Sequence, residues 1–337
     1  MSDAIAILES AYSLAGDEAA WLARITEIVR ENIPDCQGIR AQTYDLTSGA
    51  VVIRATADSG VTDEMRKASA RVALRNDESA ILPSIFRRSF VGSLRDSPRV
   101  LLRAGLDERR VREYQKRLDE FLCHFQQEDQ WWVNAQDPTM VGCIFMAGVA
   151  RRAPRSREVH EWSCVAAHVG AAFRIRRQFA AREPGPREPM ALAAEAVLSP
   201  SGRVEHAAPV AQGAPARAAL GDAVRAIDRA RGTLRRTDPE RAVELWRALV
   251  AGRWSLLDHF DSDGRRYVLA HRNDARVPED ARGLTLRERQ VLAHLALGQS
   301  NKVIAYELGL SQSTVAAHLA RARKKLHLPS MGALRLT

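Results

Sequence analysis

Hydrogen-bonding and basic side chains gather near the end of this 337-residue chain. The polar residues 312–314 come first, and basic residues follow at 321 and at 323–325. Amide and hydroxyl groups at the start of a helix can bond base edges or phosphate oxygens, where the helix dipole also favours an anion. Basic groups on the later turns can neutralise phosphates. The spacing therefore predicts a helix that contacts double-stranded DNA.

The distribution of charge indicates an anionic partner more strongly than overall basicity does. The chain has 50 basic and 41 acidic residues, a net charge of +9, but only five of the basic residues are lysines. Such arginine usage can follow from genomic base composition. Residues 283–337, in contrast, hold eight basic and two acidic residues, including three of the five lysines. This concentration of charge is typical of a nucleic-acid-binding domain.

Capping residues and glycines divide this segment into three short helices. Thr285 and Glu288 form a capping box that opens the first helix. Apolar residues from Leu286 to Leu295 recur at helical spacing, which predicts that they lie on its buried side. The helix is expected to end near Gly298.

A helix-turn-helix is predicted from the signals that follow. Ser300 can cap a helix over 301–308, and Gly309 can end it because glycine tolerates the left-handed conformation. Ser311 can then cap a third helix, from 312 to about 326. A short helix, a glycine turn and a capped helix form a DNA-binding motif.

A consistent set of residues recurs along the three helices: Leu284, Thr285, Arg287, Glu288, Val291, Leu292, Gly298, Ser300, Asn301, Lys302, Ile304, Ala305, Leu308, Ser311, Thr314, Val315, His318, Leu319, Lys325 and Leu326. This set resembles the C-terminal DNA-binding domain of LuxR-type transcription regulators, over about fifty residues. The resemblance implies a four-helix domain that binds DNA as a dimer and reads the major groove with its third helix. It also implies a preceding sensory domain and RNA polymerase as a partner.

The resemblance also implies roles for individual residues. Residues 300–302 would contact the DNA backbone or fix the second helix, and the third helix would face the bases. Ala316 and Ala320 depart from the family, which often has basic or polar residues there, and each lost phosphate contact lowers the salt dependence by about one ion. The predicted DNA-contacting residues are Ser300, Asn301, Lys302, Ser311, Gln312, Ser313, Thr314, Ala317, His318, Arg321, Lys324 and Lys325.

Two breaks divide the chain. Three prolines fall within 183–189, and a polar stretch with Pro278 runs from 273 to 283. The predicted organisation is a domain at 1–183, a linker at 184–189, a module at 190–272, a linker at 273–282 and a DNA-binding domain at 283–337, with the helix-turn-helix at about 300–326.

The first segment has the pattern of an α+β domain. Apolar residues recur at helical spacing around Trp21, and 38–45 and 50–57 flank a turn as in a β-hairpin. An apolar stripe at 111–125 predicts a long helix, and 141–149, apolar on both faces, predicts a central strand. This order resembles a GAF-type sensory domain, in which a small antiparallel sheet carries helices on one side.

A helix predicted at 156–180 carries a heptad-like apolar seam. The fourth helix implied by the resemblance has only 330–337 in which to form. A homodimer is expected, but the sequence does not tell which segment forms its interface; this seam is one candidate. Its residues are Val159, Trp162, Ala166, Val169 and Phe173.

The middle segment shows two hairpins around a helical stretch. The first pairs 196–199 with 203–207, and the second pairs 254–260 with 265–271 across an Asp-Gly turn. Strands, helices and strands in this order resemble a reduced PAS-like module. The predicted fold class is thus multidomain α+β, with GAF-like and PAS-like domains before an all-α helix-turn-helix domain.

Aromatic residues beside the predicted central strand are candidates for a small-molecule pocket. They are Tyr44, Trp131 and Trp132, together with Cys143. Core packing is the interpretation that we favour for these residues, because apolar pockets and apolar cores share this composition. No cofactor is predicted, and an unknown small-molecule ligand is left open.

One face of the helix at 156–180 carries possible metal ligands. His160, Cys164 and His168 are spaced by four residues, and imidazole and thiolate bind zinc or haem iron. No fourth ligand is evident, so we expect these residues to pack as a helix flank and predict no metal.

Several classes of protein lack support in the sequence. The longest apolar run, 141–150, is too short for the roughly 20 residues that span a bilayer. The N-terminus has no secretory pattern, and the four cysteines show no zinc-type spacing. Neither a phosphate-binding loop nor a catalytic triad is present. We therefore expect a cytoplasmic, nucleoid-associated protein that is not an enzyme and has no membrane partner.

The resulting hypothesis is a one-component LuxR-type transcription regulator whose upstream domains sense a signal or mediate dimerisation. One alternative is a protein-interaction regulator that uses a degenerate helix-turn-helix, as Ala316 and Ala320 suggest. Another alternative is a protein with a sigma-factor region 4. The C-terminal part of that region resembles residues 314–323 of this chain.

Overall fold

The computed structural model describes residues 3–72, 83, 86–87, 90–150, 154–180, 194–246, 249–250, 254–260, 263–272 and 283–328. The chain forms two compact units. The N-terminal unit is Leu14–Arg174, and the C-terminal unit combines Ser2–Ser13 with Ile175–Thr337. Both predicted linkers, 184–189 and 273–282, lie outside the described residues.

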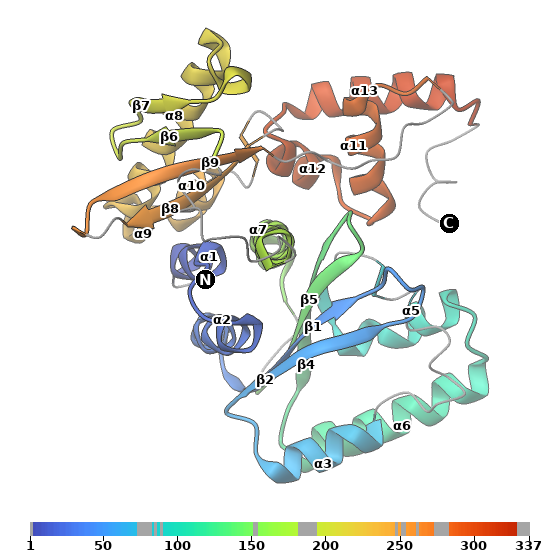
Figure 1. Ribbon diagram of the computed structural model, residues 1–337. Helices are drawn as coiled ribbons and strands as arrows, with labels where there is room; N and C mark the ends of the chain where they lie inside the picture. The colour runs from blue at the N-terminus through green and yellow to red at the C-terminus, as the bar shows by residue number, and fades with distance from the viewer. Residues whose placement is uncertain are drawn as a thin grey trace. The chain divides into compact units, whose positions relative to one another are not determined.

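The N-terminal unit is an α+β structure on a five-stranded antiparallel sheet of order β2-β1-β5-β4-β3 (Figure 1). The predicted first hairpin, long helix and central strand are confirmed. Its elements are α2 (Glu18–Asn32), β1 (Cys36–Asp45), β2 (Val52–Ser59), α3 (Asp63–Val72), β3 (Phe90–Ser93), the 3-10 helix η2 (Leu94–Asp96), α5 (Ser97–Arg103), α6 (Glu108–His124), β4 (Asp129–Asp137), β5 (Val141–Val149) and most of α7 (Ser156–Ala180).

One face of this sheet packs against α2 and α7 (Figure 1). Trp21 of α2 stacks on Phe173 of α7, with ring centroids 5.6 Å apart. Helix α7 lies close to β4 at Gly170, where a Cβ would be in ordinary van der Waals contact, 3.5 Å from the carbonyl oxygen of Ala135. Cys143, paired with Ala135, is fully buried on this face.

The opposite face is covered by α3, α5 and α6 (Figure 1). Strand alternation directs Tyr44 and Ile144 here, where they form a core with Tyr114, Leu118 and Phe121. The apolar stripe of α6 therefore packs against this face of the sheet.

The C-terminal unit contains a second antiparallel sheet, of order β7-β6-β9-β8. Both predicted hairpins are confirmed, and β6 joins them by pairing with β9. Its elements are α1 (Ala4–Tyr12), β6 (Ala196–Leu198), β7 (Val204–Ala207), the 3-10 helix η3 (Pro209–Ala211), α8 (Ala214–Arg231), α9 (Leu234–Thr237), α10 (Pro239–Leu245), β8 (Trp254–Phe260), β9 (Arg266–Arg272), α11 (Leu286–Ala296), α12 (Asn301–Leu308) and α13 (Gln312–Lys325).

Helix α1 belongs with the middle of the chain rather than with the helix that follows it. Arg235 reaches Asp3 with Nε 2.7 Å from Oδ1, and reaches Glu9 with Nη1 3.2 Å from Oε2. Ile5, Ile7 and other apolar residues of α1 are buried, and α1 contacts α10. These contacts join two segments more than 200 residues apart in the chain.

The apolar seam predicted on α7 is occupied within the chain. Trp162, Ala166, Val169 and Phe173 are all buried, and Phe173 stacks on Trp21. These side chains already have intramolecular partners, which argues against the seam as the dimer contact.

Candidate nucleic-acid interface

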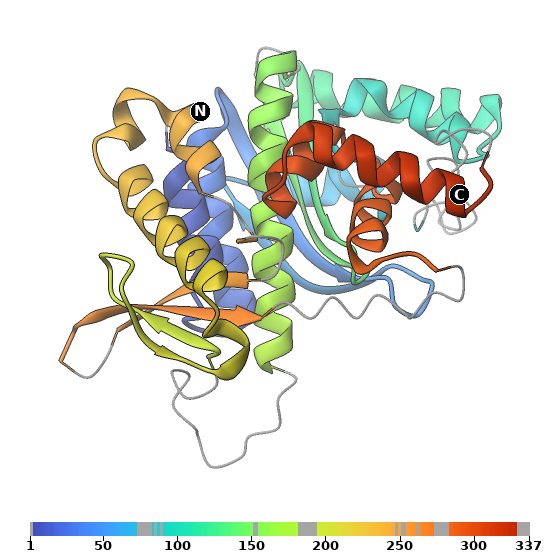
Figure 2. The same cartoon turned by 90° about the horizontal axis from the view of Figure 1, so that it is seen from above.

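Helices α11, α12 and α13 pack around one apolar core (orange to red in Figure 2). Leu286 is 42% exposed and lies outside this core, so the expectation that it is on the buried side is wrong. The core residues are Val291, Leu295, Ile304, Ala305, Leu308, Val315 and Leu319.

A glycine turn separates α12 from α13 as predicted. Gly309 adopts φ +64° and ψ +36°, the left-handed conformation in which an L side chain is strained. Ser300 caps the start of α12 by accepting a hydrogen bond from the Val303 N–H at 3.3 Å. Leu310 donates its N–H to the Ala305 carbonyl at 2.8 Å and packs beside the core. These contacts fix the direction in which the chain enters α13.

Hydroxyl groups surround the N-terminus of α13. Ser311 Oγ accepts the Thr314 N–H at 3.0 Å and lies 2.8 Å from Ser313 Oγ and 2.7 Å from Thr314 Oγ1. Gln312 and Ser313 are exposed in the first turn. The positive end of the helix dipole thus carries groups that can bond an anion or a base edge.

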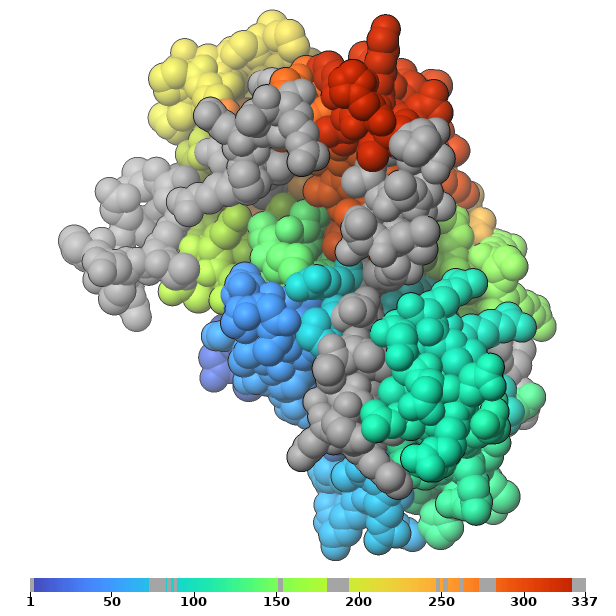
Figure 3. Space-filling model, turned by 90° about the vertical axis from the view of Figure 1, so that its right-hand side faces the viewer, coloured from blue at the N-terminus to red at the C-terminus, as the bar shows by residue number. Residues whose placement is uncertain are grey.

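A solvent-facing stripe runs along α13, which lies at the surface in Figure 3. The stripe is opposite Val315, Leu319 and Ala322, which are buried. Lys324 has no ion-pair partner within the described part of the chain. The exposed residues of the stripe are Gln312, Ser313, Ala316, Ala317, Ala320, Arg321, Arg323 and Lys324.

His318 lies at the edge of this stripe and is held by Arg321. The guanidinium Nη2 donates to His318 Nδ1 at 3.0 Å, since arginine has no acceptor. Partial burial and the charge of Arg321 lower the pKa of His318. Both the lowered pKa and the hydrogen bond from Arg321 to Nδ1 favour the neutral ring with its proton on Nε2.

Lys325 is engaged in an internal ion pair rather than free for a ligand. Its Nζ lies 2.7 Å from Oε2 of Glu288, whose side chain is only 2% exposed. Burial alone would raise the pKa of Glu288, but hydrogen bonds from Lys325 and Thr285 outweigh it and the pKa is lowered. Arg321 Nε lies 3.6 Å from the other carboxylate oxygen. The pair joins the start of α11 to the end of α13.

Replacing Lys325 with methionine is expected to destabilise the packing of α11 against α13 by about 1–3 kcal/mol, because a buried carboxylate loses a partner. Hydrogen-exchange mass spectrometry of peptides from α11 and α13 measures this loss. Because the pKa of Glu288 is lowered, its stabilising contribution is complete above the ordinary glutamate pKa, about 4.3, and is lost as pH falls through the lower folded value. An equal difference between wild type and variant at pH 7 and at about pH 3, after correction for intrinsic exchange, would contradict this assignment.

A buried polar cluster links α11 to α12. His294 Nδ1 lies 2.9 Å from Gln299 Oε1, and Gln299 Nε2 donates to Glu307 Oε2 at 2.9 Å. All three side chains are buried, so their hydrogen bonds offset the cost of removing them from water. Neither this cluster nor the Glu288–Lys325 pair was predicted, because both depend on contacts between helices.

The remaining predicted DNA contacts lie at the start of α12. Asn301 is half-buried, whereas Lys302 is exposed. Ser300 is exposed but uses its hydroxyl as a cap. The exposed methyl groups of Ala316 and Ala320 stand on the α13 stripe where additional polar contacts were expected.

The predicted pocket residues are divided between the two faces of the N-terminal sheet. Tyr44 and Trp132 lie on the face covered by α6, where Tyr44 Oη donates to Asn134 Oδ1 at 2.7 Å. Trp131 and Cys143 are buried on the opposite face. Two neighbouring tryptophans of one strand cannot share a face, because side chains alternate.

The metal candidates lie on α7. Cys164 and His168 are buried, and His160 is half-buried. Within the described ranges, no group of three or more His, Cys, Asp or Glu residues is arranged to hold a metal ion.

The three helices define a helix-turn-helix domain. Residues 282–334 match the family described as bacterial regulatory proteins, luxR family. The C-terminal segment is therefore a LuxR-family helix-turn-helix domain.

Two curated relatives are similar in this region. The transcriptional regulatory protein FixJ of Azorhizobium caulinodans is 41% identical over 70 residues, which cover 20% of this chain and 33% of that protein. The glycerol metabolism activator of Pseudomonas putida is 39% identical over 67 residues, covering 20% and 29%. This chain thus spans about a third of the length of the relatives it matches.

One solved structure aligns with most of the chain. Escherichia coli SdiA covers 95% of this chain and 90% of that chain, at 10% identity and a TM-score of 0.31. Similarity at this level does not establish a shared fold.

Proposed function

We propose that the chain is a DNA-binding transcriptional regulator of the LuxR type, which places α13 in the major groove of double-stranded DNA. The exposed stripe of α13 supports this proposal, since it combines hydrogen-bonding groups at the helix start with Arg321 and Lys324 further along. The family match of 282–334 supports the same role. The proposal includes all the DNA-contacting residues that were predicted from the sequence, from Ser300 to Lys325.

Side-chain exposure divides the proposed contacts into base contacts and phosphate contacts. Gln312, Ser313 and Ala317 are the candidates for base contacts, because they are exposed on the first two turns of α13. Arg321 and Lys324 are the candidates for phosphate contacts, and Lys302 can add a third from α12. Lys325 acts mainly by holding Glu288, and Ser300 and Ser311 act mainly as caps.

Titration of the full chain with fluorescent genomic DNA fragments at several salt concentrations tests the proposal. We expect log Kobs to fall linearly with log salt, with a slope of about −2 to −3 from two or three phosphate contacts per chain. Absent or salt-insensitive binding would contradict it and favour the protein-interaction alternative, which the exposed Ala316 and Ala320 motivate. Native mass spectrometry of the same complexes gives the number of chains per duplex, and a single chain would contradict the proposed homodimer.

The proposal extends to the rest of the chain. The N-terminal unit has helices on both faces of its antiparallel sheet, not on one face as the GAF-type pattern implied. Its order of elements still motivates the proposal of a GAF-like sensory domain, and 190–272 is proposed as a PAS-like module. A signal bound upstream would act by favouring one arrangement of the DNA-binding domains, which requires different affinity for the ligand in the two arrangements. The domain boundaries at 183, 190 and 283 stay predictions.

RNA polymerase and a cytoplasmic, nucleoid-associated location follow from the proposed role in transcription. Among the described helices, none combines the length and apolar composition that a membrane span requires. Catalysis forms no part of the proposal.

A further inference from the structure

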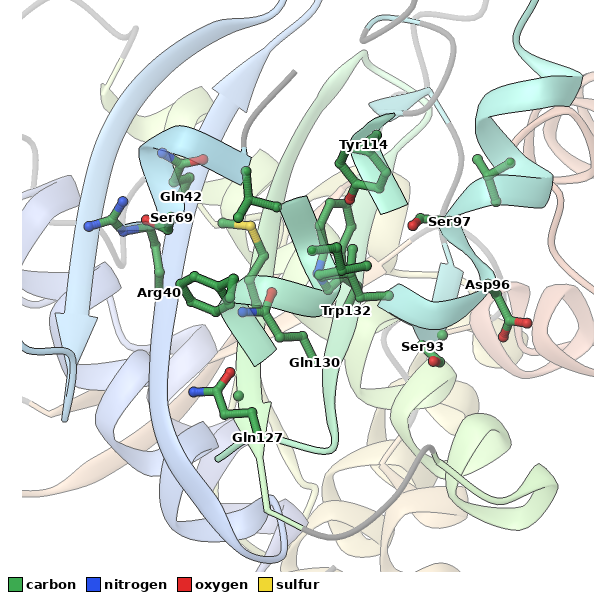
Figure 4. Close-up of a pocket in the computed structure, with 18 of the residues that line it drawn as sticks. Arg40, Gln42, Ser69, Ser93, Asp96, Ser97, Tyr114, Gln127, Gln130 and Trp132 are labelled. Atoms are coloured by element: carbon green, nitrogen blue, oxygen red, sulfur yellow. The ribbon is translucent and has the colours of Figure 1, made fainter. Parts of the chain in front are cut away.

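A cavity of about 580 Å³ lies in the N-terminal unit, on the sheet face opposite α2 and α7 (Figure 4). Residues of β1, β3, β4 and β5 line one side, and residues of α3, α5 and α6 line the other. Ligand sites in proteins occupy roughly 300–1,000 Å³. The cavity is therefore large enough for a small organic molecule.

Apolar side chains of α3 line the cavity although none of them is fully buried. Met65 and Val72 are only half-buried, and no residue of this amphipathic helix is fully buried. Both side chains line the cavity, opposite Trp132 and Met146 of the sheet. The apolar side of α3 thus faces the cavity, and an apolar ligand would complete its packing.

Among the described residues that line the cavity, no buried charge is unpaired. Arg40 lines it but forms a two-point ion pair with Asp58, with Nε 2.8 Å from Oδ1 and Nη2 3.0 Å from Oδ2. Asp96, the other charged lining residue, is exposed at the rim. An uncharged ligand fits these surroundings, because burying a charge without a partner is costly.

Three buried polar atoms of lining residues have no hydrogen-bond partner among the described residues. They are Nε1 of Trp132, a donor, Oε1 of Gln127, an acceptor, and the hydroxyl Oγ of Ser97, which can do either. Gln127 is 6% exposed, and its amide lies directly over Gly148, where a Cβ would come within 2.3 Å of Nε2. Figure 4 shows the Trp132 and Gln127 side chains at the wall of the cavity.

We propose that this cavity binds an uncharged, mainly apolar small molecule with an amide-like polar group. Its carbonyl oxygen would accept from Trp132 Nε1, and its N–H would donate to Gln127 Oε1. This deepens the sensory part of the proposed function by assigning the site and the ligand class. Binding to the cavity can be measured without DNA, so its failure is distinguishable from failure of the proposed DNA binding.

Gly92 offers a direct way to fill the cavity. It lines the cavity on β3, opposite Trp132, and a Cβ there would meet no atom closer than 4.0 Å, Cδ2 of Phe90. Leucine at this position would extend into the ligand space on the same sheet face as Trp132. Gly213, the N-cap of α8, is a matched control, since a Cβ there also meets nothing closer than 3.9 Å.

The test uses the full chain and prodan, an uncharged fluorescent naphthalene whose ketone oxygen can accept a hydrogen bond. We expect saturable binding of one prodan per chain, weakened at least about tenfold by Gly92→Leu and unchanged by Gly213→Leu. Trp132→Phe, which keeps an aromatic ring but removes the donor, should weaken binding about threefold or more and shift the emission of bound prodan to the blue.

Competition with two matched compounds tests the ligand class. Octanamide and octanoate share a chain length, but only octanamide is uncharged at pH 7. We expect octanamide to displace prodan at a concentration about tenfold or more below that of octanoate.

Several outcomes would overturn the proposal. They are non-saturable binding, equal affinity in wild type and Gly92→Leu, and preferential displacement by octanoate. Circular dichroism shows whether Gly92→Leu folds. If it does not, the Trp132→Phe variant and the competition between octanamide and octanoate test the site instead. Unchanged prodan affinity and emission in Trp132→Phe, together with equal displacement by the two compounds, would reject the site.

Discussion

Replacing Arg321 and Lys324 together with alanine is expected to weaken binding of the full chain to duplex DNA by about tenfold or more at physiological salt. Both side chains are exposed on the α13 stripe, and Lys324 has no ion-pair partner among the described residues. Each phosphate contact releases about one counterion, so the slope of log Kobs against log salt should become shallower by about two per chain.

Fluorescence anisotropy of the same DNA fragments, titrated at four or more salt concentrations, measures both quantities. The matched control is Arg217→Ala with Arg229→Ala, which removes two positive charges from exposed positions on α8. If both double variants lose affinity equally, general charge rather than the α13 surface attracts DNA. Unaltered binding in the Arg321 and Lys324 variant would reject α13 as the DNA-contacting helix.

The double variant could lose DNA affinity because α11 and α13 unfold or because contacts with DNA are removed, and hydrogen exchange separates the two causes. Arg321 also lies near Glu288 and bonds His318, so its removal alters two internal contacts. The Glu288–Lys325 pair remains and should keep α11 against α13. Hydrogen-exchange protection of α11 and α13 should therefore be nearly unchanged in the double variant.

Replacing Ile304 with alanine is expected to unfold the helix-turn-helix and abolish DNA binding. Ile304 is fully buried in the core shared by α11, α12 and α13. Isoleucine-to-alanine changes at such sites cost about 2–5 kcal/mol, whereas a single core of this size rarely supplies more than about 3–5 kcal/mol. The loss is thus comparable to the whole stability of the domain.

Hydrogen exchange in α11, α12 and α13 measures this effect, with anisotropy as the functional readout. Leu286→Ala is the control, because it also removes apolar atoms but from a side chain that is 42% exposed. We expect Leu286→Ala to change protection by less than about 1 kcal/mol. Native protection and native DNA affinity in Ile304→Ala would show that the three helices do not depend on this core.

The local structure of the helix-turn-helix was predictable because its determinants are close together in the chain. Thr285 and Glu288 form the capping box, Ser300 and Ser311 cap the next two helices, and Gly309 takes the left-handed turn. Each of these contacts joins residues no more than three or four positions apart, so residue type and spacing are sufficient. Leu286 was predicted to be buried but is exposed, because helical periodicity alone does not show how far the surface that covers the helix extends.

The upstream site was only partly predictable. Strand alternation could have separated Trp131 from Trp132, and would have pointed to Trp132 alone. Gln127 and Gly92 also line the cavity, but no sequence pattern marked them as pocket residues. Their position depends on how β3, β4 and α6 come together. The association of α1 with Arg235 likewise joins residues more than 200 positions apart.

The sequence by itself determined the helices of the DNA-binding segment, the hairpins and the central strand, because capping, alternation and turn chemistry act over a few residues. Only the tertiary structure decided which surfaces are free. It covers the α7 seam, pairs Lys325 with Glu288, leaves Arg321 and Lys324 exposed, and encloses a cavity beside Trp132. Burial and ion pairing between distant segments depend on how complete elements pack, which local residue patterns do not specify.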